Sequence, residues 1–473
     1  MSVPDLELLE RFAAIVGTAN ALWPGETDLT PYTQENRHIF EGRTPLVLRP
    51  GNTQEVAAIM RLAFETGTAV VPQGGHTGHA GGGAPDDSGG QIVVVLTRMN
   101  RLREVDLAGS TMTVEAGMVL QQAQEIADRH DRLFPLALGS QGSCQIGGNI
   151  STNAGGTGVI AHGNMREQVI GLEVVLPNGE VWNGLRKLRK DNTGYALKQL
   201  FIGAEGTLGI VTAAVLRLLP KPKGREVAYV AVESPRKALD LLNLAQGQAG
   251  PALTAFELIH RTPMTFALKH GTGARDPFGA VHDWYVLAEI SSGRSAGDAR
   301  ALAESIFGEA LEGGLALDVV LAENLGQQAA FWKLREDMVT AQPHEGGSIK
   351  NDISVPVHLI PEFLEQAGLA VAAAMPDARI VAFGHMGDGN LHYNISQPEG
   401  GDARAFLARR EEINALVNTI VLSLDGSISA EHGIGRLKRD LLAATKSPVE
   451  MAMMRAVKQA LDPTGIMNPG KVV

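Results

Sequence analysis

The sequence predicts an α+β protein with more than one domain, and three observations support this prediction. The chain has 473 residues, which is too long for one compact core. Its first half alternates short β-branched runs with amphipathic segments, a pattern typical of mixed strands and helices. A charged run with Pro and Gly at residues 221–224 then interrupts the pattern, and further strands and helices follow it.

The first half contains two strong local signals. Residues 52–55 (NTQE) resemble a capping box, which predicts that a helix begins there. Residues 177–179 (PNG) predict the tight turn of a hairpin. We expect strands at residues 45–49, 68–71, 91–96, 111–115, 172–176, 180–182 and 208–219, and helices at about 53–64 and 119–130.

The second half predicts an antiparallel sheet with helices packed on one side of it. The expected strands are residues 227–232, 253–259, 284–290 and 317–322, and the expected helices are 236–245, 296–311 and 327–340. Residues 436–461 are predicted to form a helical C-terminal segment.

Composition narrows the class of protein. A net charge of −11 does not favour nucleic-acid binding. Cys144 is the single cysteine, which excludes an intrachain disulfide. Neither a signal peptide nor a run of about twenty apolar residues is evident, so we expect a cytoplasmic protein without a transmembrane segment.

Glycine is enriched to 55 residues, and two dense clusters lie at residues 74–83 and 139–163. Glycine allows consecutive backbone amides to face an anion, so two such loops could hold a diphosphate from both sides. For any single loop, a tight turn is an equally good interpretation. No Gly-x-Gly-x-x-Gly occurs, and residues 465–471 lack the Ser or Thr of a P-loop, so neither common nucleotide fingerprint applies.

A second group of motifs predicts a metal site. Residues 384–394 (GHMGDGNLHYN) fit a hairpin whose strands cover about 378–385 and 391–396, which brings His385 and His392 close together. Residues 430–433 (AEHG) add Glu431, expected in a loop. Two His and one carboxylate form an open catalytic metal site, which suits zinc or non-haem iron. Structural histidines are the alternative interpretation.

These motifs together resemble those of a known family. VPQGGHTG at 71–78, CQIGGN at 144–149, NAGG at 153–156, KDNTGY at 190–195 and GAEGTLG at 203–209 resemble the FAD-binding half of the vanillyl-alcohol-oxidase-type (PCMH-type) flavoproteins. The metal motifs and NPGKV at 468–472 resemble the D-2-hydroxyacid dehydrogenase branch, which includes D-lactate and D-2-hydroxyglutarate dehydrogenases. The resemblance extends from about residue 40 to the C-terminus.

The resemblance implies a domain plan and an FAD site. The plan is an N-terminal helical segment (1–41), a two-subdomain FAD-binding domain (42–220), an α+β substrate domain with an antiparallel sheet (221–430), and a C-terminal segment that returns to the flavin (431–473). Some relatives attach FAD covalently through a histidine placed like His76, but the dehydrogenase branch favours non-covalent FAD. The residues implied for FAD are Pro72, Gly74, Gly75, His76, Thr77, Gly78, Gly142, Ser143, Gly147, Gly148, Asn149, Asn153, Gly156, Glu205, Gly209, Ile210 and Asn468.

The predicted chemistry is oxidation of a D-2-hydroxy acid to the 2-oxo acid. With a flavin present to take electrons, a redox-inert Lewis acid such as Zn²⁺ is the favoured metal, held by His385, His392 and Glu431. His432 would take the hydroxyl proton as general base, and the α-hydrogen would leave as hydride to the flavin N5.

The resemblance also assigns the substrate contacts to Arg335, Lys350 and Asn394. Relatives that act on 2-hydroxyglutarate have a threonine four residues after this arginine, where this chain has Val339. The chain therefore departs from the family pattern at a substrate position.

The expected partners are a small anionic 2-hydroxy acid and an electron acceptor, either an electron-transfer flavoprotein, a cytochrome or a quinone. Two alternatives remain open: an oxygen-using oxidase, and a non-redox flavin-dependent transferase of the same superfamily. The identity of the acid and the oligomeric state also stay open, with a homodimer among the options.

Overall fold

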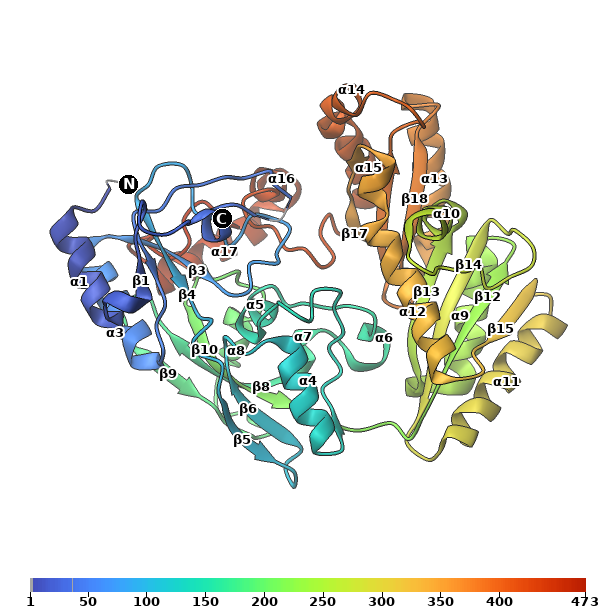
Figure 1. Cartoon of the computed structure of the whole chain (residues 1–473), viewed down its shortest axis with the longest axis horizontal. Helices are drawn as coiled ribbons and strands as arrows, with labels where there is room; N and C mark the ends of the chain where they lie inside the picture. Colours follow the sequence, from blue (N-terminus) through green and yellow to red (C-terminus); the bar gives the residue numbers. More distant parts are fainter. Residues whose placement is uncertain (1–2, 36) are drawn as a thin grey trace. The chain divides into compact units, whose positions relative to one another are not determined.

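The computed structural model describes residues 3–35 and 37–473. The chain divides into two compact units, which we describe separately (Figure 1). Unit 1 comprises Met1–Gly155, Asn164–Pro220 and Glu431–Val473, and unit 2 comprises Gly156–Gly163 and Lys221–Ala430. Among the described residues, no helix combines the length and the apolar character needed to cross a membrane.

Unit 1 contains two main sheets, with strand orders β1-β2-β4-β3 and β5-β6-β10-β8-β9. Their strands are β1 (Ala21–Leu22), β2 (Val47–Leu48), β3 (Ala69–Gln73), β4 (Gln91–Val95), β5 (Leu102–Asp106), β6 (Thr111–Glu115), β8 (Val169–Val175), β9 (Val181–Gly184) and β10 (Ile210–Arg217), while β7 (Arg132–Leu133) pairs with β11 (Leu219–Pro220). The helices are α1 (Leu6–Val16), α2 (Thr30–Thr33), α3 (Thr53–Thr66), α4 (Leu120–Arg129), α5 (Ile146–Ser151), α7 (Met165–Gln168), α8 (Lys198–Phe201), α16 (Arg439–Thr445) and α17 (Pro448–Leu461).

Helix α3 shows how local sequence positions the first glycine loop. The Asn52 side chain accepts a hydrogen bond from the Glu55 backbone N–H at 2.9 Å, as the predicted capping signal requires. Gly67 ends the helix in the left-handed conformation, with φ of 68°. The chain then enters β3, which pairs in parallel with β4 and leads directly into the loop that begins at Gly74.

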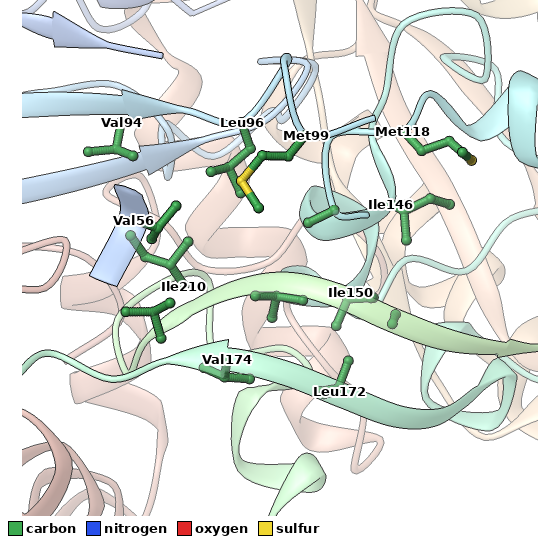
Figure 2. Packing of buried hydrophobic residues seen from close by; sticks show 14 of the residues in the cluster. Val56, Val94, Leu96, Met99, Met118, Ile146, Ile150, Leu172, Val174 and Ile210 are labelled. Atoms are coloured by element: carbon green, nitrogen blue, oxygen red, sulfur yellow. The ribbon is translucent and has the colours of Figure 1, made fainter. Parts of the chain in front are cut away.

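One apolar core joins the two sheets of unit 1. Figure 2 shows Val94 of β4 and Val56 of α3 packed in the same cluster as Val174 of β8 and Ile210 of β10. Ile150 of α5 belongs to this cluster too. Helix α5, which carries the second glycine loop, is therefore held by the shared core.

The C-terminal segment is an integral part of unit 1. Its end pairs with β3 through an isolated parallel bridge between Met467 and Val70. The Val70 N–H donates to the Ile466 carbonyl, and the Asn468 N–H donates to the Val70 carbonyl, both at 2.8 Å. The helical C-terminal segment predicted over residues 436–461 is present as two separate helices, α16 and α17. The break lies at Ser447, which caps α17 through a capping box with Glu450.

Unit 2 is built on an eight-stranded sheet with the order β15-β12-β14-β13-β18-β19-β16, in which β17 also pairs with β19. The strands are β12 (Gly224–Val232), β13 (Leu253–His260), β14 (Trp284–Ser292), β15 (Asp318–Leu321), β16 (Ser348–Ile349), β17 (Asp352–Ser354), β18 (Arg379–His385) and β19 (Asn390–Ser396). The helices are α6 (Val159–His162), α9 (Pro235–Ala249), α10 (Arg261–His270), α11 (Ala296–Glu312), α12 (Leu325–Thr340), α13 (Ile360–Ala374), α14 (Ala403–Ala408) and α15 (Arg410–Ser423).

Helices cover both faces of this sheet, so the prediction of helices on one side was wrong. In β12, the odd-numbered residues 227–231 are buried in a cluster with α10 and α12. The even-numbered residues 228–232 are buried in a second cluster with α9, α11 and α13. A strand that is apolar on both faces must be covered on both, and this continuous apolar run was the signal that the prediction overlooked.

The predicted hairpin is present as β18 and β19, which are joined by the short 3₁₀ turn η5 (Met386–Asp388). The turn requires glycine. Gly389 has φ of 90°, and a Cβ atom there would lie 2.4 Å from the Val355 carbonyl oxygen.

Candidate active site

A cavity of about 1020 Å³, including its open mouth, lies within unit 1. It is lined by many of the residues that the sequence implies for FAD, namely Pro72, Gly74, Gly75, His76, Thr77, Gly78, Gly147, Gly148, Asn149, Glu205, Gly209 and Ile210. His432, the predicted base, also lines it.

The residues around this cavity fit a large polar cofactor. A Cβ atom at Gly75 would lie 2.1 Å from the Ser143 carbonyl oxygen, so glycine is what lets the two predicted loops approach each other. The side-chain atoms Asn149 Nδ2 and Gln145 Oε1 are buried without a hydrogen-bond partner. Buried polar atoms are normally satisfied, and the polar groups of a bound FAD would satisfy these.

Four other predicted FAD residues do not line this cavity. Gly142 and Ser143 are exposed. The Asn153 side chain accepts a hydrogen bond from the backbone N–H of Arg166 at 2.9 Å, which stabilises the first turn of α7. Gly156 begins the short segment that belongs to unit 2.

Two buried amide side chains brace the first glycine loop. Gln73 donates from Nε2 to the Gly83 carbonyl at 2.8 Å, which ties the start of the loop to its end. Asn468 donates from Nδ2 to the carbonyls of Gly82, at 2.9 Å, and Glu205, at 2.8 Å. Asn468 therefore contacts two cavity-forming segments without lining the cavity.

Glu205 holds the segment that carries His432. Its carboxylate accepts hydrogen bonds from the backbone N–H groups of Ile434 and Gly435, both at 2.7 Å. Gly433 has φ of 74°, and a Cβ atom there would lie 2.8 Å from Glu205 Oε1. The residues after His432 thus form an irregular turn, as predicted. Burial raises the pKa of Glu205, and the two backbone hydrogen bonds oppose this effect.

Two further histidines lie beside the cavity. The ring of His79 meets the ring of His432 edge to face, with centroids 4.7 Å apart. Burial lowers the pKa of His76, an effect that the nearby Glu35 carboxylate opposes. Glu35 also lines the cavity. It comes from the N-terminal segment, where nothing in the sequence marks it.

In unit 2, the hairpin brings the predicted histidines together. Phe383 of β18 lies opposite His392 of β19, and the ring centroids of His385 and His392 are 5.7 Å apart. This separation allows one nitrogen from each ring to bind the same cation. His385 is buried and His392 is half-buried.

A buried glutamate that the sequence analysis missed contacts this pair. Glu257, on β13, is fully buried, and one of its oxygens is hydrogen-bonded to His385 Nδ1. The other oxygen accepts a hydrogen bond from Arg335 Nε at 2.7 Å and forms an ion pair with Arg335 Nη2, also at 2.7 Å. Burial alone would raise the pKa of Glu257, but His385 and Arg335 lower it well below its usual value. A Glu inside an otherwise apolar strand was a signal for such pairing.

The other predicted substrate residues share one partner. The Lys350 ammonium donates to Oε1 of Gln342 at 2.7 Å, and the Asn394 amide donates to the same oxygen at 3.0 Å. Asn394 in turn accepts from the Asn351 backbone N–H at 3.2 Å. Gln342 is buried, and the sequence analysis gave it no role.

Glu431 is connected to the hairpin through the chain. Ser427 donates its N–H to the Ser354 carbonyl of β17 at 2.7 Å, and Asp352 of β17 lies opposite His392. Glu431 follows this anchor by four residues, a tether of at most ~14 Å. It comes directly after Ala430, the last residue of unit 2.

Two family models match the chain. Residues 44–184 match the family described as FAD binding domain, and residues 221–472 match FAD linked oxidases, C-terminal domain. The chain belongs to the FAD-linked oxidases. Its resemblance to PCMH-type flavoproteins and the predicted α+β fold are thereby confirmed.

Curated relatives place the chain in the D-2-hydroxyacid dehydrogenase branch of this family. The mitochondrial D-2-hydroxyglutarate dehydrogenase of Arabidopsis thaliana is 38% identical over 470 residues, which is 99% of this chain and 82% of the relative. The D-2-hydroxyglutarate dehydrogenase of Xanthomonas citri pv. viticola is 39% identical over 445 residues, 94% of this chain and 92% of the relative. The D-2-hydroxyglutarate–pyruvate transhydrogenase of Saccharomyces cerevisiae is 35% identical over 480 residues, 100% of this chain and 95% of the relative.

Solved structures share the fold at lower identity. p-Cresol methylhydroxylase has a TM-score of 0.75 at 16% identity and covers 98% of this chain and 96% of its own. Alkyldihydroxyacetonephosphate synthase has a TM-score of 0.74 at 17% identity, with coverage of 99% and 86%. At these identities the likeness establishes the fold alone.

Proposed function

We propose that this FAD-linked enzyme oxidises a D-2-hydroxy acid to the 2-oxo acid, with Zn²⁺ held by His385, His392 and Glu431. The observation that carries the proposal is the pairing of His385 and His392, whose rings are 5.7 Å apart, beside the buried Glu257–Arg335 ion pair. A cation site next to a buried guanidinium suits a substrate that has both a hydroxyl and a carboxylate. The relatives named D-2-hydroxyglutarate dehydrogenases support the same substrate class.

The roles of individual residues follow from their chemistry. Bound as proposed, zinc supplies a Lewis acid that lowers the pKa of an alcohol, and FAD supplies an acceptor for the α-hydride. His432 takes the hydroxyl proton as general base, a role that suits imidazole near neutral pH. Arg335 and Lys350 hold the substrate carboxylate, and Asn394, which shares Gln342 with Lys350, orients it.

The reduced flavin passes its electrons on to a protein or a quinone. The range of substrates depends on a second position in helix α12. Val339 lies one helical turn after Arg335, is half exposed, and offers no hydrogen bond where 2-hydroxyglutarate-specific relatives have a threonine. The Thr340 hydroxyl donates to the Asp337 carbonyl of its own helix at 3.3 Å. We therefore expect activity on acids without a second carboxylate, such as D-lactate.

Anaerobic bleaching of the flavin tests this function. The purified holoprotein is mixed with D-lactate, D-malate, D-2-hydroxyglutarate and their L-forms, and the flavin absorbance is followed. At least one D-acid should reduce the flavin, and its L-form should not. If every acid leaves the flavin oxidised, the proposed reaction is wrong. Peroxide formed per turnover in air then separates a dehydrogenase from an oxidase.

A further inference from the structure

Glu257 is a charged residue in the middle of an apolar sheet. Its neighbours on β13, Phe256 and Leu258, are both buried in hydrophobic clusters, and β13 lies between β14 and β18. Such a carboxylate must be paired, because an unpaired buried charge is strongly disfavoured. The pairing uses both oxygens, one on His385 and one on Arg335.

This arrangement determines which nitrogen of His385 can bind a metal. Arg335 is 5% exposed and keeps Glu257 ionised, and an ionised carboxylate can only accept hydrogen bonds. The proton of the neutral imidazole must therefore be on Nδ1, so Nε2 is the unprotonated nitrogen that would bind a cation. A histidine ligand whose other nitrogen donates to a carboxylate is better oriented and more basic.

The same carboxylate also fixes Arg335. Two of its guanidinium nitrogens contact Glu257, and the guanidinium carbon lies 4.6 Å from the centre of the Phe383 ring. The guanidinium plane is therefore held both at its edge and on its face. One buried group thus connects a predicted metal ligand with a predicted substrate cation.

We propose that Glu257 is a positioning residue that sets the metal affinity of the site by fixing the tautomer and orientation of His385, and that it holds Arg335 in place for the substrate carboxylate. This inference rests on the proposed function, because it requires that His385 bind a cation. A purely structural ion pair is the competing interpretation, and it predicts an effect on stability without an effect on metal affinity.

The chain offers a matched control in Glu345. This glutamate is also buried, and its Oε1 accepts from Lys269 Nζ at 2.7 Å and contacts His270 Nε2 at 2.6 Å. Its other oxygen pairs with Arg379, six residues before His385 on the same strand and therefore ~20 Å from it. Glu257→Gln and Glu345→Gln both disrupt a buried carboxylate with basic partners, but only the first touches the proposed metal ligand.

The experiment measures the Zn²⁺ dissociation constant of the holoflavoprotein by competition with a chromophoric chelator. Glu257→Gln should weaken zinc binding by about 10- to 100-fold, the range found for carboxylates that support histidine ligands. Glu345→Gln should leave the constant within about twofold, whatever its effect on the unfolding temperature. If both variants bind zinc like the wild type, the inference about Glu257 is wrong.

Two outcomes keep the test decisive. If the wild type itself does not bind zinc, the proposed metal site is wrong. If the wild type binds zinc and the Glu257→Gln variant binds it equally well, only the inference about Glu257 is wrong. If Glu257→Gln does not fold, Glu257→Asp takes its place, since the shorter side chain withdraws the carboxylate from Nδ1 and keeps the charge. Glu257→Asp should still weaken zinc binding by about fivefold or more, and an unchanged constant would overturn the inference.

Discussion

Replacing Glu205 by glutamine should loosen the turn that positions His432. The carboxylate accepts the Ile434 and Gly435 N–H groups at 2.7 Å, so each oxygen serves one backbone donor. Glutamine keeps one acceptor and turns an NH₂ group toward the other donor. The lost charge-assisted hydrogen bond costs ~1.5–3 kcal/mol. The backbone N–H that now faces the NH₂ group has no acceptor, which costs a further ~1–3 kcal/mol. A smaller desolvation penalty for the neutral side chain offsets part of this, so about 3 kcal/mol remains.

The loss is measurable in two ways. For a unit of this size, about 3 kcal/mol corresponds to a fall of roughly 6–12 °C in the unfolding temperature. A displaced His432 should also lower the rate of anaerobic flavin reduction by about 10- to 100-fold, because misplacement of a reacting group by about 1 Å has effects of this size.

Glu450→Gln is the control for this prediction. Glu450 accepts a backbone hydrogen bond from Ser447 at 3.1 Å at an exposed helix start in the same unit. Glutamine can make the same contact there, so stability should change by less than about 0.5 kcal/mol. The reasoning about Glu205 is refuted if Glu205→Gln matches Glu450→Gln in both unfolding temperature and flavin reduction rate.

Three further predictions follow from unit 2. Replacing His392 by alanine should weaken zinc binding by more than about 100-fold, measured by chelator competition, because it removes a ligand and not only its support. Val339→Thr should raise kcat/KM for D-2-hydroxyglutarate relative to D-lactate by about 10- to 100-fold, the value of one hydrogen bond to a charged group. An unchanged ratio would show that this position does not contact substrate. Burial alone would raise the pKa of Glu345, but hydrogen bonds from its basic partners lower this pKa to about 2. The ionised carboxylate therefore stabilises the folded state fully above pH 4.5, the usual pKa of a glutamate. This contribution to the free energy of unfolding is lost as pH falls toward about 2. Urea unfolding of wild type and Glu345→Gln should accordingly differ by about 3 kcal/mol at pH 7 and converge as pH falls below about 4.5, whereas a pH-independent difference would contradict this linkage.

The sequence predicted those parts of the site that local signals encode. The hairpin that carries His385 and His392 is encoded by strand alternation and by the glycines of its turn, and the first glycine loop follows directly from β3. The start of α17 within the predicted helical C-terminal segment is also encoded locally, by the capping box of Ser447 and Glu450.

What the sequence did not predict depends on distant residues. Glu257 lies 128 positions from His385, and no local pattern pairs the two. Gln342 reaches Asn394 across 52 positions, and only the order of strands in the sheet places them together. The apolar run of β12 indicates that both sheet faces are covered, but which helices cover each face depends on the topology of unit 2.

The most direct test of the account is the metal dependence of flavin reduction. The rate of anaerobic bleaching by the most active D-2-hydroxy acid is measured before chelation, after chelation with FAD retained, and after one equivalent of Zn²⁺ is returned. A catalytic zinc ion predicts a rate at least about 100-fold lower after chelation, restored when zinc is returned. A chelated, metal-free protein that reduces its flavin at the original rate would contradict it.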